Sequence, residues 1–277
     1  MDVDGSGRQL GGVFDSIAAE YDAYRPTYPD DLVDLACAGL AAGDPVLEVG
    51  CGSGQLTRSL VARGLQVTAV DPGSRLLALA AREAPGVRFV NAPFEEAELG
   101  GQFPAMFSAS ALHWIDPDVS WSRAAGALSP GGTLALLQYC GIEDDDDQAA
   151  QLEALRRAAP RTAAAWPALR SLPALMAGIE KRRANVSEVW SWVAQRDLAR
   201  AAGRLFDDVR AAAVPVVWER TATELIALLR TLSPYHHLTA DQQSVFEASI
   251  VDLERDLGRP IRSTTAAVLV TARKAEP

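Results

Sequence analysis

The stretch Val46-Leu-Glu-Val-Gly-Cys-Gly-Ser-Gly-Gln-Leu-Thr57 decides the fold of this chain. An apolar run that contains Glu48 is followed by Gly50, Gly52 and Gly54, and then by a helical pattern. Because glycine accepts positive φ angles and has no Cβ, such a loop lets a ligand lie against bare backbone. The helix after it directs its first amide groups and its positive dipole end at the same place. The stretch therefore predicts a strand, a loop and a helix with a ligand site at the end of the strand.

Short apolar runs alternate with helical patterns on the carboxyl side of this loop, which is typical of parallel strands joined by crossover helices. The strands are predicted at Pro45–Val49, Gln66–Val70, Val87–Asn91, Met106–Ser110, Thr133–Gln138, Val214–Arg220 and Ala266–Ala272. The helices between them are predicted at Gln55–Arg63, Ser74–Ala84, Ser120–Leu128, Thr223–Leu232 and Ala240–Leu257. Pro130-Gly131-Gly132 predicts a turn before the fifth strand. The sequence therefore predicts an α/β fold.

The region from about Glu143 to Arg210 is predicted to be helical throughout, and Pro160, Pro167 and Pro173 divide it into several short helices. Since strand patterns resume after it, we interpret it as an insertion. Its position in the chain would place it over the carboxyl ends of the strands, where it would exclude water and contact the substrate. Its tryptophans predict either a flat, apolar binding surface or ordinary core packing.

The composition limits the classes of partner. The net charge of -10 and the pI of about 4.8 disfavour nucleic acid, because an acidic surface repels phosphates. Three widely spaced cysteines favour reduced thiols in a cytoplasmic protein. The N-terminal residues lack the pattern of a signal peptide, and no apolar run reaches the roughly 20 residues that span a membrane. We interpret the acidic run Glu143–Asp147 as a solvated turn and predict no metal site.

Three classes of nucleotide site compete for the glycine loop. A P-loop requires a lysine that is absent here, and a dinucleotide fingerprint requires G-x-G-x-x-G where this chain has Gln55 after Gly54. The third form has an acidic residue two positions before the first glycine, and Glu48 occupies this position before Gly50. Asp71, at the end of the next strand, can accept hydrogen bonds from both ribose hydroxyls of a nucleoside. This position also suits NAD, so it supports a nucleoside site of either kind.

The third form resembles motif I of the class I S-adenosylmethionine-dependent methyltransferases. Further segments are similar to the group of that family related to trans-aconitate methyltransferase. They are Phe14-Asp-Ser-Ile-Ala-Ala-Glu-Tyr-Asp-Ala-Tyr-Arg-Pro-Thr-Tyr-Pro29, Phe89-Val-Asn-Ala-Pro-Phe-Glu95, Phe107-Ser-Ala-Ser-Ala-Leu-His-Trp-Ile-Asp-Pro117 and Trp121-Ser-Arg-Ala-Ala-Gly-Ala-Leu-Ser-Pro-Gly-Gly-Thr-Leu-Ala135. The resemblance implies a Rossmann-like, doubly wound, seven-stranded and mostly parallel sheet with a helical cap insertion and an N-terminal lid. The resemblance covers residues 13–140 well and the part from about Val214 in outline, and it hardly constrains the insertion. Together with the helical pattern of the insertion, it leads us to assign residues 1–34 to the lid, 35–140 and 214–277 to the core, and 141–213 to the cap.

The resemblance also implies the cofactor, S-adenosylmethionine, with S-adenosylhomocysteine as product, and the residues that bind it. Glu48, Gly50 and Gly52 are expected to hold the methionine part, and Asp71 the ribose. The adenine is expected between Pro72 on one face and Ala92, Pro93 and Phe94 on the other. Ser110 is expected near the methyl group, and Tyr21 and Arg25 in the lid. Alternatively, Tyr21, Tyr24 and Tyr28 form a helix face that packs on the core.

The acceptor is expected to be a small molecule methylated on oxygen or nitrogen, ahead of a carboxylate or carbon, in bacterial secondary metabolism. The segment after the fourth strand lacks the Asn/Asp-Pro-Pro-Tyr of enzymes that methylate nucleobase amines. An acceptor of high pKa needs a base, and His113, His236 and His237 are the histidines of the chain. The alternatives are packing roles for these histidines and, for the whole protein, a regulatory or scaffold protein that binds the cofactor without catalysis. The oligomeric state is not predicted.

Overall fold

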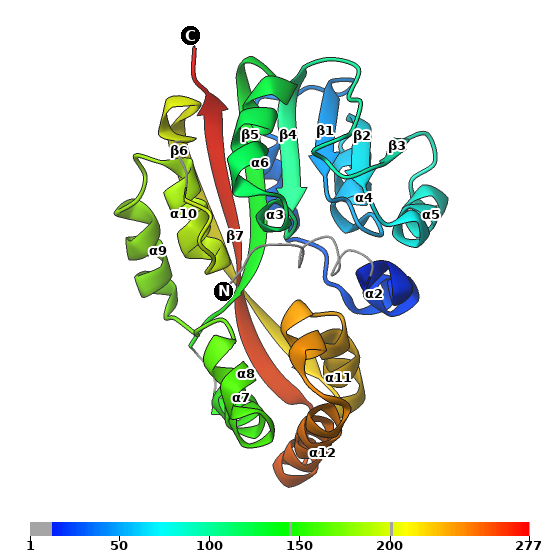
Figure 1. The fold of residues 1–277 in the computed structure, drawn as a ribbon, viewed down its shortest axis with the longest axis vertical. Coiled ribbons are helices and arrows are strands. Elements are labelled where there is room, and N and C mark those ends of the chain that lie inside the picture. Colours follow the sequence, from blue (N-terminus) through cyan, green and yellow to red (C-terminus); the bar gives the residue numbers. More distant parts are fainter. Residues whose placement is uncertain (1–12, 144–145, 200–201, 277) are drawn as a thin grey trace.

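The computed structural model describes residues 13–143, 146–199 and 202–276. Within these residues seven strands form one sheet in the order β3-β2-β1-β4-β5-β7-β6 (Figure 1). The strands are β1 (Pro45–Val49), β2 (Gln66–Asp71), β3 (Arg88–Asn91), β4 (Phe103–Ala109), β5 (Leu128–Gly141), β6 (Phe206–Arg220) and β7 (Ile261–Lys274). β1 to β5 run parallel, and β7 runs antiparallel to β5 and β6. The predicted seven-stranded, mostly parallel sheet is confirmed.

The strand order places the ligand site. The chain moves outward from β1 to β2 and β3, and then returns to form β4 on the other side of β1. The segments that leave β1 and β4 therefore diverge, and such a switch point opens a crevice at the carboxyl ends of the strands. The glycine loop follows β1, and Ser110 follows β4, so both border this crevice.

Helices cover both faces of the sheet, so its central strands are buried on both sides. One face is covered by α3 (Asp30–Ala36), α4 (Gln55–Ala62) and α5 (Ser74–Glu83). The other is covered by α6 (Pro117–Ala127), α9 (Leu172–Glu180) and α10 (Val186–Ala194). Side chains of β5 alternate between the two faces, as strand geometry requires: Leu134 and Leu136 pack with the second set, and Ala135 and Leu137 with the first.

A separate group of helices lies beyond the carboxyl ends of β1 to β4, around the long strands β5 to β7 (Figure 1). It contains α7 (Asp146–Ala158), α8 (Pro160–Ala165), α11 (Ala222–Arg230), the short η3 (Ser233–His237) and α12 (Ala240–Leu257). These helices share an apolar core that includes Leu155, Leu225, Phe246 and Ile250. We call this group the helical cluster.

The packing differs from the predicted division into a core and a cap of residues 141–213. Only α7 and α8 of that segment join the helical cluster, whereas α10 buries Val186, Val189, Trp190 and Val193 on the sheet. Conversely, α11 and α12 belong to the helical cluster although the prediction placed them with the core. β6 begins at Phe206 rather than Val214. The sequence pattern indicates that a helix has an apolar face, but it does not indicate which of two apolar surfaces that face covers.

The predicted turn Pro130-Gly131-Gly132 lies inside β5. Leu128 pairs with Phe103 and Thr133 with Ala105, so the residues between them form an irregularity opposite a shorter segment of β4. Gly131 there has a φ of +66°, which explains the turn-like composition.

Helix α2 (Ala18–Tyr24) connects the two parts of the molecule, since it packs against both α5 and α11 (Figure 1). Residues 1–12 of the predicted lid lie outside the described residues. No helix in the described part of the chain is both long and apolar enough to cross a membrane.

Candidate functional site

The glycine loop after β1 has a conformation that requires glycine. Gly50, Gly52 and Gly54 have φ angles of +72°, +55° and +91°. A Cβ on Gly50 would lie 2.2 Å from the Cβ of Ala111, in the segment after β4. A Cβ on Gly52 would lie 3.4 Å from the ring of Tyr21 in α2. The chain therefore encloses the loop on two sides. Ala111 and Tyr21 can lie this close because glycine has no Cβ.

Asp71, at the end of β2, ties this loop to the next one. Its carboxylate accepts hydrogen bonds from the backbone N–H of Gly52 (2.9 Å) and of Gly73 (2.8 Å). Burial raises the pKa of Asp71, and these two hydrogen bonds oppose the increase. Since a carboxylate has about four acceptor positions, two remain for a ligand. Asn91, a residue that the sequence prediction did not single out, donates to the carbonyl groups of Asp71 and Pro72 and so fixes this strand end.

Glu48 is a buried acid beside the loop. Its carboxylate accepts a hydrogen bond of 2.6 Å from the Thr57 hydroxyl. Burial raises the pKa of Glu48 from 4.5 to about 8, against the hydrogen bond from Thr57, and the nearby charge of Asp71 raises it further. Glu48 is therefore mainly protonated at neutral pH, and the site carries less negative charge than its sequence suggests.

A pocket opens at the carboxyl edge of the sheet where these elements meet. Its walls come from α2 and the segment after it, the glycine loop, the start of α4, and the ends of β4 and β5. The lining residues are Tyr21, Arg25, Pro26, Tyr28, Glu48, Gly50, Cys51, Gln55, Leu56, Ala109, Ser110 and Tyr139. Five of the residues predicted to bind the cofactor line it: Tyr21, Arg25, Glu48, Gly50 and Ser110. Gly52 and Asp71 adjoin it through their mutual hydrogen bond.

The residues predicted to surround the adenine differ in their exposure. Ala92 and Pro93 are partly exposed at the end of β3, close to Pro72 through the hydrogen bonds of Asn91. Phe94, in contrast, is 3% exposed and its ring lies in the core, with the guanidinium of Arg123 5.3 Å from its centroid. The structure thus places the Phe94 ring away from the surface of the crevice, because α6 covers it.

His113 lies in the 3-10 turn η1 (Leu112–Trp114), next to the rings of Trp114 (4.9 Å) and Trp190 (6.4 Å). Burial lowers its pKa to about 3, and the charges of Arg196 and Arg25 add to the decrease. Its Nδ1 has no hydrogen-bond partner. Such a histidine stays neutral near pH 7 and is a weak base.

The other two histidines lie in η3 of the helical cluster. The ring of His236 lies 6.4 Å from that of Phe14, and burial lowers the pKa of His236. Its Nε2 has no hydrogen-bond partner within residues 13–143, 146–199 and 202–276. His237 is exposed. Of the pair, His236 is therefore the one that faces the N-terminal segment.

Phe14 is the centre of an aromatic contact that the sequence did not reveal. Its ring lies 5.8 Å from Tyr21, 6.1 Å from Trp114 and 6.4 Å from His236. Arg25 adds a polar link, since its Nη2 donates to the carbonyl of Thr231 at the end of α11 (2.7 Å). The N-terminal segment thus joins the core to the helical cluster beside the pocket.

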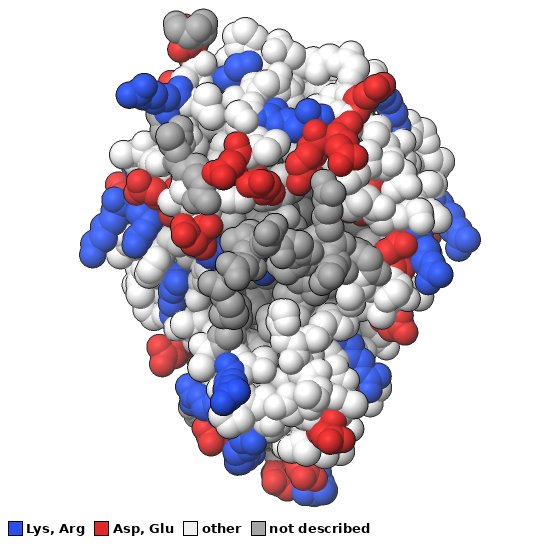
Figure 2. Space-filling model, in the orientation of Figure 1, with Lys and Arg blue, Asp and Glu red and all other residues white. Residues whose placement is uncertain are grey.

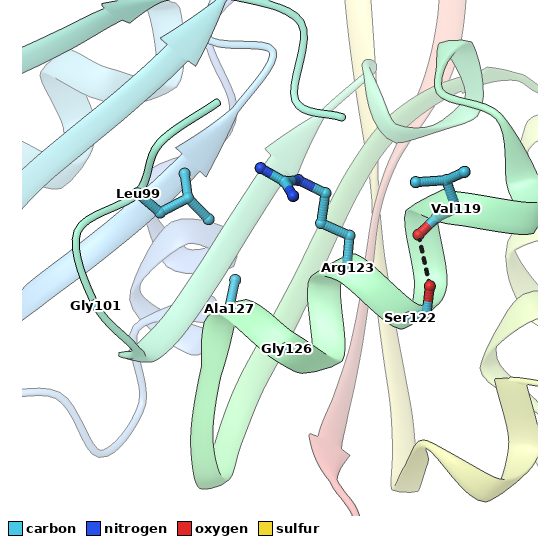
Figure 3. A pocket seen from close by; sticks show the side chains of 7 residues that line it. All are labelled: Leu99, Gly101, Val119, Ser122, Arg123, Gly126 and Ala127. Atoms are coloured by element: carbon cyan, nitrogen blue, oxygen red, sulfur yellow. Dashed lines mark hydrogen bonds between the residues drawn. The ribbon is translucent and has the colours of Figure 1, made fainter. Parts of the chain in front are cut away.

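A second hollow lies on the outside of α6 (Figure 3). It is open and is lined by Leu99, Gly101, Val119, Ser122, Arg123, Gly126 and Ala127. Gly101 and Ala127 lie just before β4 and β5, so the hollow extends toward the amino ends of these strands. The guanidinium of Arg123 is held by the carbonyl groups of Phe94 and Ala97. This surface is therefore separate from the crevice.

The seven-stranded sheet and the glycine loop after β1 agree with the fold that the resemblance to class I methyltransferases implies. Residues 47–136 match the family model described as a methyltransferase domain. The predicted resemblance to class I S-adenosylmethionine-dependent methyltransferases is thereby confirmed for this part of the chain.

Similar proteins agree with this class. An uncharacterized methyltransferase of Mycobacterium tuberculosis is 36% identical over 133 residues, 48% of this chain and 54% of that protein. The trans-aconitate 2-methyltransferase of Methylobacterium nodulans is 36% identical over 115 residues, 40% of this chain and 44% of that enzyme. The chain spans about half the length of these curated relatives. A solved protein of Anaeromyxobacter dehalogenans shares the fold, with a TM-score of 0.59 and 22% identity over 92% of this chain and 100% of the other.

Proposed function

We propose that this protein is an S-adenosylmethionine-dependent methyltransferase that methylates an oxygen or nitrogen atom of a small molecule. The observation that carries the proposal is the pocket at the carboxyl edge of the sheet, where the glycine loop, Asp71 and the N-terminal segment meet. The names of the relatives support methyl transfer, and one of them acts on trans-aconitate, a small molecule. A cytoplasmic location and a role in secondary metabolism are part of the proposal.

The donor and acceptor groups of the pocket fit this cofactor. The glycine loop offers its backbone to the methionine part between the close approaches of Ala111 and Tyr21, and Asp71 offers its free acceptor positions to the ribose. Ala92, Pro93 and Pro72 provide the partly exposed apolar surface for adenine. Arg25 has a buried Nε–H with no partner in the described part of the chain, which suits an anionic group of the ligand.

When bound, the cofactor supplies a methyl group on a sulfonium, which an acceptor takes by in-line displacement. The chain's contribution is positioning and the exclusion of water. Phe14, Tyr21 and Trp114 form an apolar cover beside the pocket. Glu48 is the acid among the lining residues of the pocket, and when it is protonated it does not neutralise the positive charge of Arg25.

The environment of His113 argues against a base there. A group with a pKa near 3 takes a proton poorly at neutral pH, so we favour an acceptor that needs no strong base. His236, whose ring meets Phe14, remains the histidine proposed for proton transfer, ahead of exposed His237.

The proposal is tested by calorimetry with S-adenosylhomocysteine on the wild type and on Asp71→Ala. We expect at least a tenfold loss of affinity, because the ribose loses a charged partner and the loop loses its bond at Gly52; about 1.4 kcal/mol suffices for this. Asp44→Ala is the control, since Asp44 accepts a backbone hydrogen bond in an exposed turn before β1. Equal affinity in wild type and Asp71→Ala would remove Asp71 from the site.

Binding alone does not separate an enzyme from a protein that only binds the cofactor. Incubation with a radiolabelled methyl donor and a panel of metabolites makes this distinction. Label in a small-molecule product is the expected result. Cofactor binding without label in any product would favour the regulatory or scaffold alternative.

We expect the segment of residues 17–25 to act as a lid over bound cofactor. Its backbone amides donate hydrogen bonds within one helical turn, from Tyr21 N–H to the Ile17 carbonyl and from Arg25 N–H to the Tyr21 carbonyl. Hydrogen exchange of these amides should slow when S-adenosylhomocysteine is added, since a ligand contacting Tyr21 and Arg25 stabilises the closed form. The amides of α12 provide the internal control. Unchanged exchange in residues 17–25 would favour simple packing of the tyrosines.

A further inference from the structure

Two hydroxyl groups face each other in the wall of the pocket. The Tyr28 hydroxyl, between α2 and α3, lies 2.9 Å from the Ser110 Oγ, directly after β4. Both residues line the pocket, and Tyr28 was not among the residues that the sequence analysis assigned to the cofactor.

Both hydroxyls are held in place. Ser110 has a φ of +53°, in the left-handed region that few residues other than glycine adopt, and its N–H donates to the Leu137 carbonyl (2.8 Å). The Tyr28 side chain is 8% exposed and stacks on Tyr139 at 4.9 Å. The Tyr139 hydroxyl in turn donates to the Thr27 carbonyl (2.6 Å). A strained backbone position persists only where the surroundings determine it, and it is frequent at ligand sites.

The direction of the hydrogen bond between the hydroxyls follows from their acidity. A phenol is a much stronger donor than an aliphatic alcohol, so Tyr28 donates and Ser110 accepts. Burial raises the pKa of Tyr28, so its proton stays in place. The Ser110 hydroxyl then keeps its own hydrogen for another partner.

Arg25 presents a second free donor to the same pocket. Its Nη2 is bonded to the Thr231 carbonyl, but its Nε is buried without a partner among the residues that the structure describes. The acid among the lining residues, Glu48, has a raised pKa and accepts from Thr57. The pocket therefore combines two free N–H or O–H donors with a positive charge, and a carboxylate is the group that satisfies them.

We infer that Tyr28 is a positioning residue: it orients the Ser110 hydroxyl, which together with Arg25 would hold the carboxylate of the amino-acid part of the cofactor. This inference rests on the proposed function. Tyr28 acts through Ser110, so removal of either hydroxyl should weaken recognition of the same ligand group.

The test compares two ligands by calorimetry. S-adenosylhomocysteine carries the amino-acid part, whereas 5′-methylthioadenosine has the same nucleoside and sulfur without it. We expect Ser110→Ala to bind S-adenosylhomocysteine about tenfold more weakly and Tyr28→Phe three- to tenfold more weakly. Both variants should bind 5′-methylthioadenosine as the wild type does. The double variant should be no weaker than Ser110→Ala, because the two hydroxyls act in series.

Tyr235→Phe is the matched control, since it removes the hydroxyl of a buried tyrosine, bonded to Glu247 within the helical cluster. Its affinity for both ligands should equal that of the wild type. Tyr28→Phe that weakens both ligands equally would show a merely structural role and overturn the inference, as would unchanged binding of both. A wild type that binds neither ligand would contradict the proposed function itself.

Discussion

Gly50→Ala is expected to lower the affinity for S-adenosylhomocysteine by at least a hundredfold. A Cβ at this position would lie 2.2 Å from the Ala111 Cβ, a distance that forces the glycine loop and the segment after β4 apart. Both segments line the pocket, so their separation displaces Glu48 and Ser110 as well. The measurement is calorimetry of the ligand with the purified variant, after circular dichroism has shown that it is folded.

The matched control is Gly39→Ala. Gly39 has a φ of +88°, so alanine there meets the same backbone penalty, but no atom lies within 4 Å of the added Cβ. Such a penalty is about 1 kcal/mol. Both variants should lose a similar amount of stability from backbone strain, and only Gly50→Ala should lose binding. Normal binding in Gly50→Ala would show that the close approach to Ala111 is not required by the site.

Glu48→Gln is expected to stabilise the protein in alkaline solution, by at most about 5 kcal/mol at 1.36 kcal/mol per pKa unit. The pKa of Glu48 is raised in the folded state from 4.5 to about 8 by burial. The folded state therefore binds this proton more tightly than the unfolded state, and its contribution to stability is complete below about pH 4.5. It is lost as the pH rises toward 8 and stays lost above it. Glutamine is neutral at every pH and retains an oxygen that can accept from Thr57.

The measurement is urea unfolding of both proteins between pH 5 and pH 9. The difference in unfolding free energy between Glu48→Gln and wild type should grow in favour of the variant as the pH increases. Glu83→Gln, at an exposed position at the end of α5, is the control and should follow the wild type. A difference that is constant over this range would show that Glu48 is ionised in the folded protein throughout.

Local sequence determined β1, β2 and the glycine loop between β1 and α4, for physical reasons that act over a few residues. β1 was predicted with its observed bounds because its apolar run ends at glycines, and glycine is required where φ is positive. Asp71 and Ser110 were predicted to lie at one edge of the sheet because Asp71 ends a strand and Ser110 follows one, and parallel strands bring their carboxyl ends to one edge. The pattern also predicted the helices α11 and α12, since both have apolar faces and Ser/Thr-type N-terminal caps.

Tertiary structure alone decided which of these elements touch. The sequence around Trp190 does not show whether this residue packs on the sheet or belongs to a substrate cap. Its helix α10 has one apolar face, which could cover either the sheet or the helical cluster, and in the structure it covers the sheet. Burial lowers the pKa of His113, and the charges of Arg196 and Arg25 add to the decrease; both arginines, and Trp190 beside the imidazole, come from distant segments. The Tyr28–Ser110 pair joins residues 82 positions apart, and its bond exists because stacking on Tyr139 and the left-handed turn after β4 fix both hydroxyls. Contacts of this kind depend on packing across the whole chain, so a sequence pattern with a range of a few residues does not contain them.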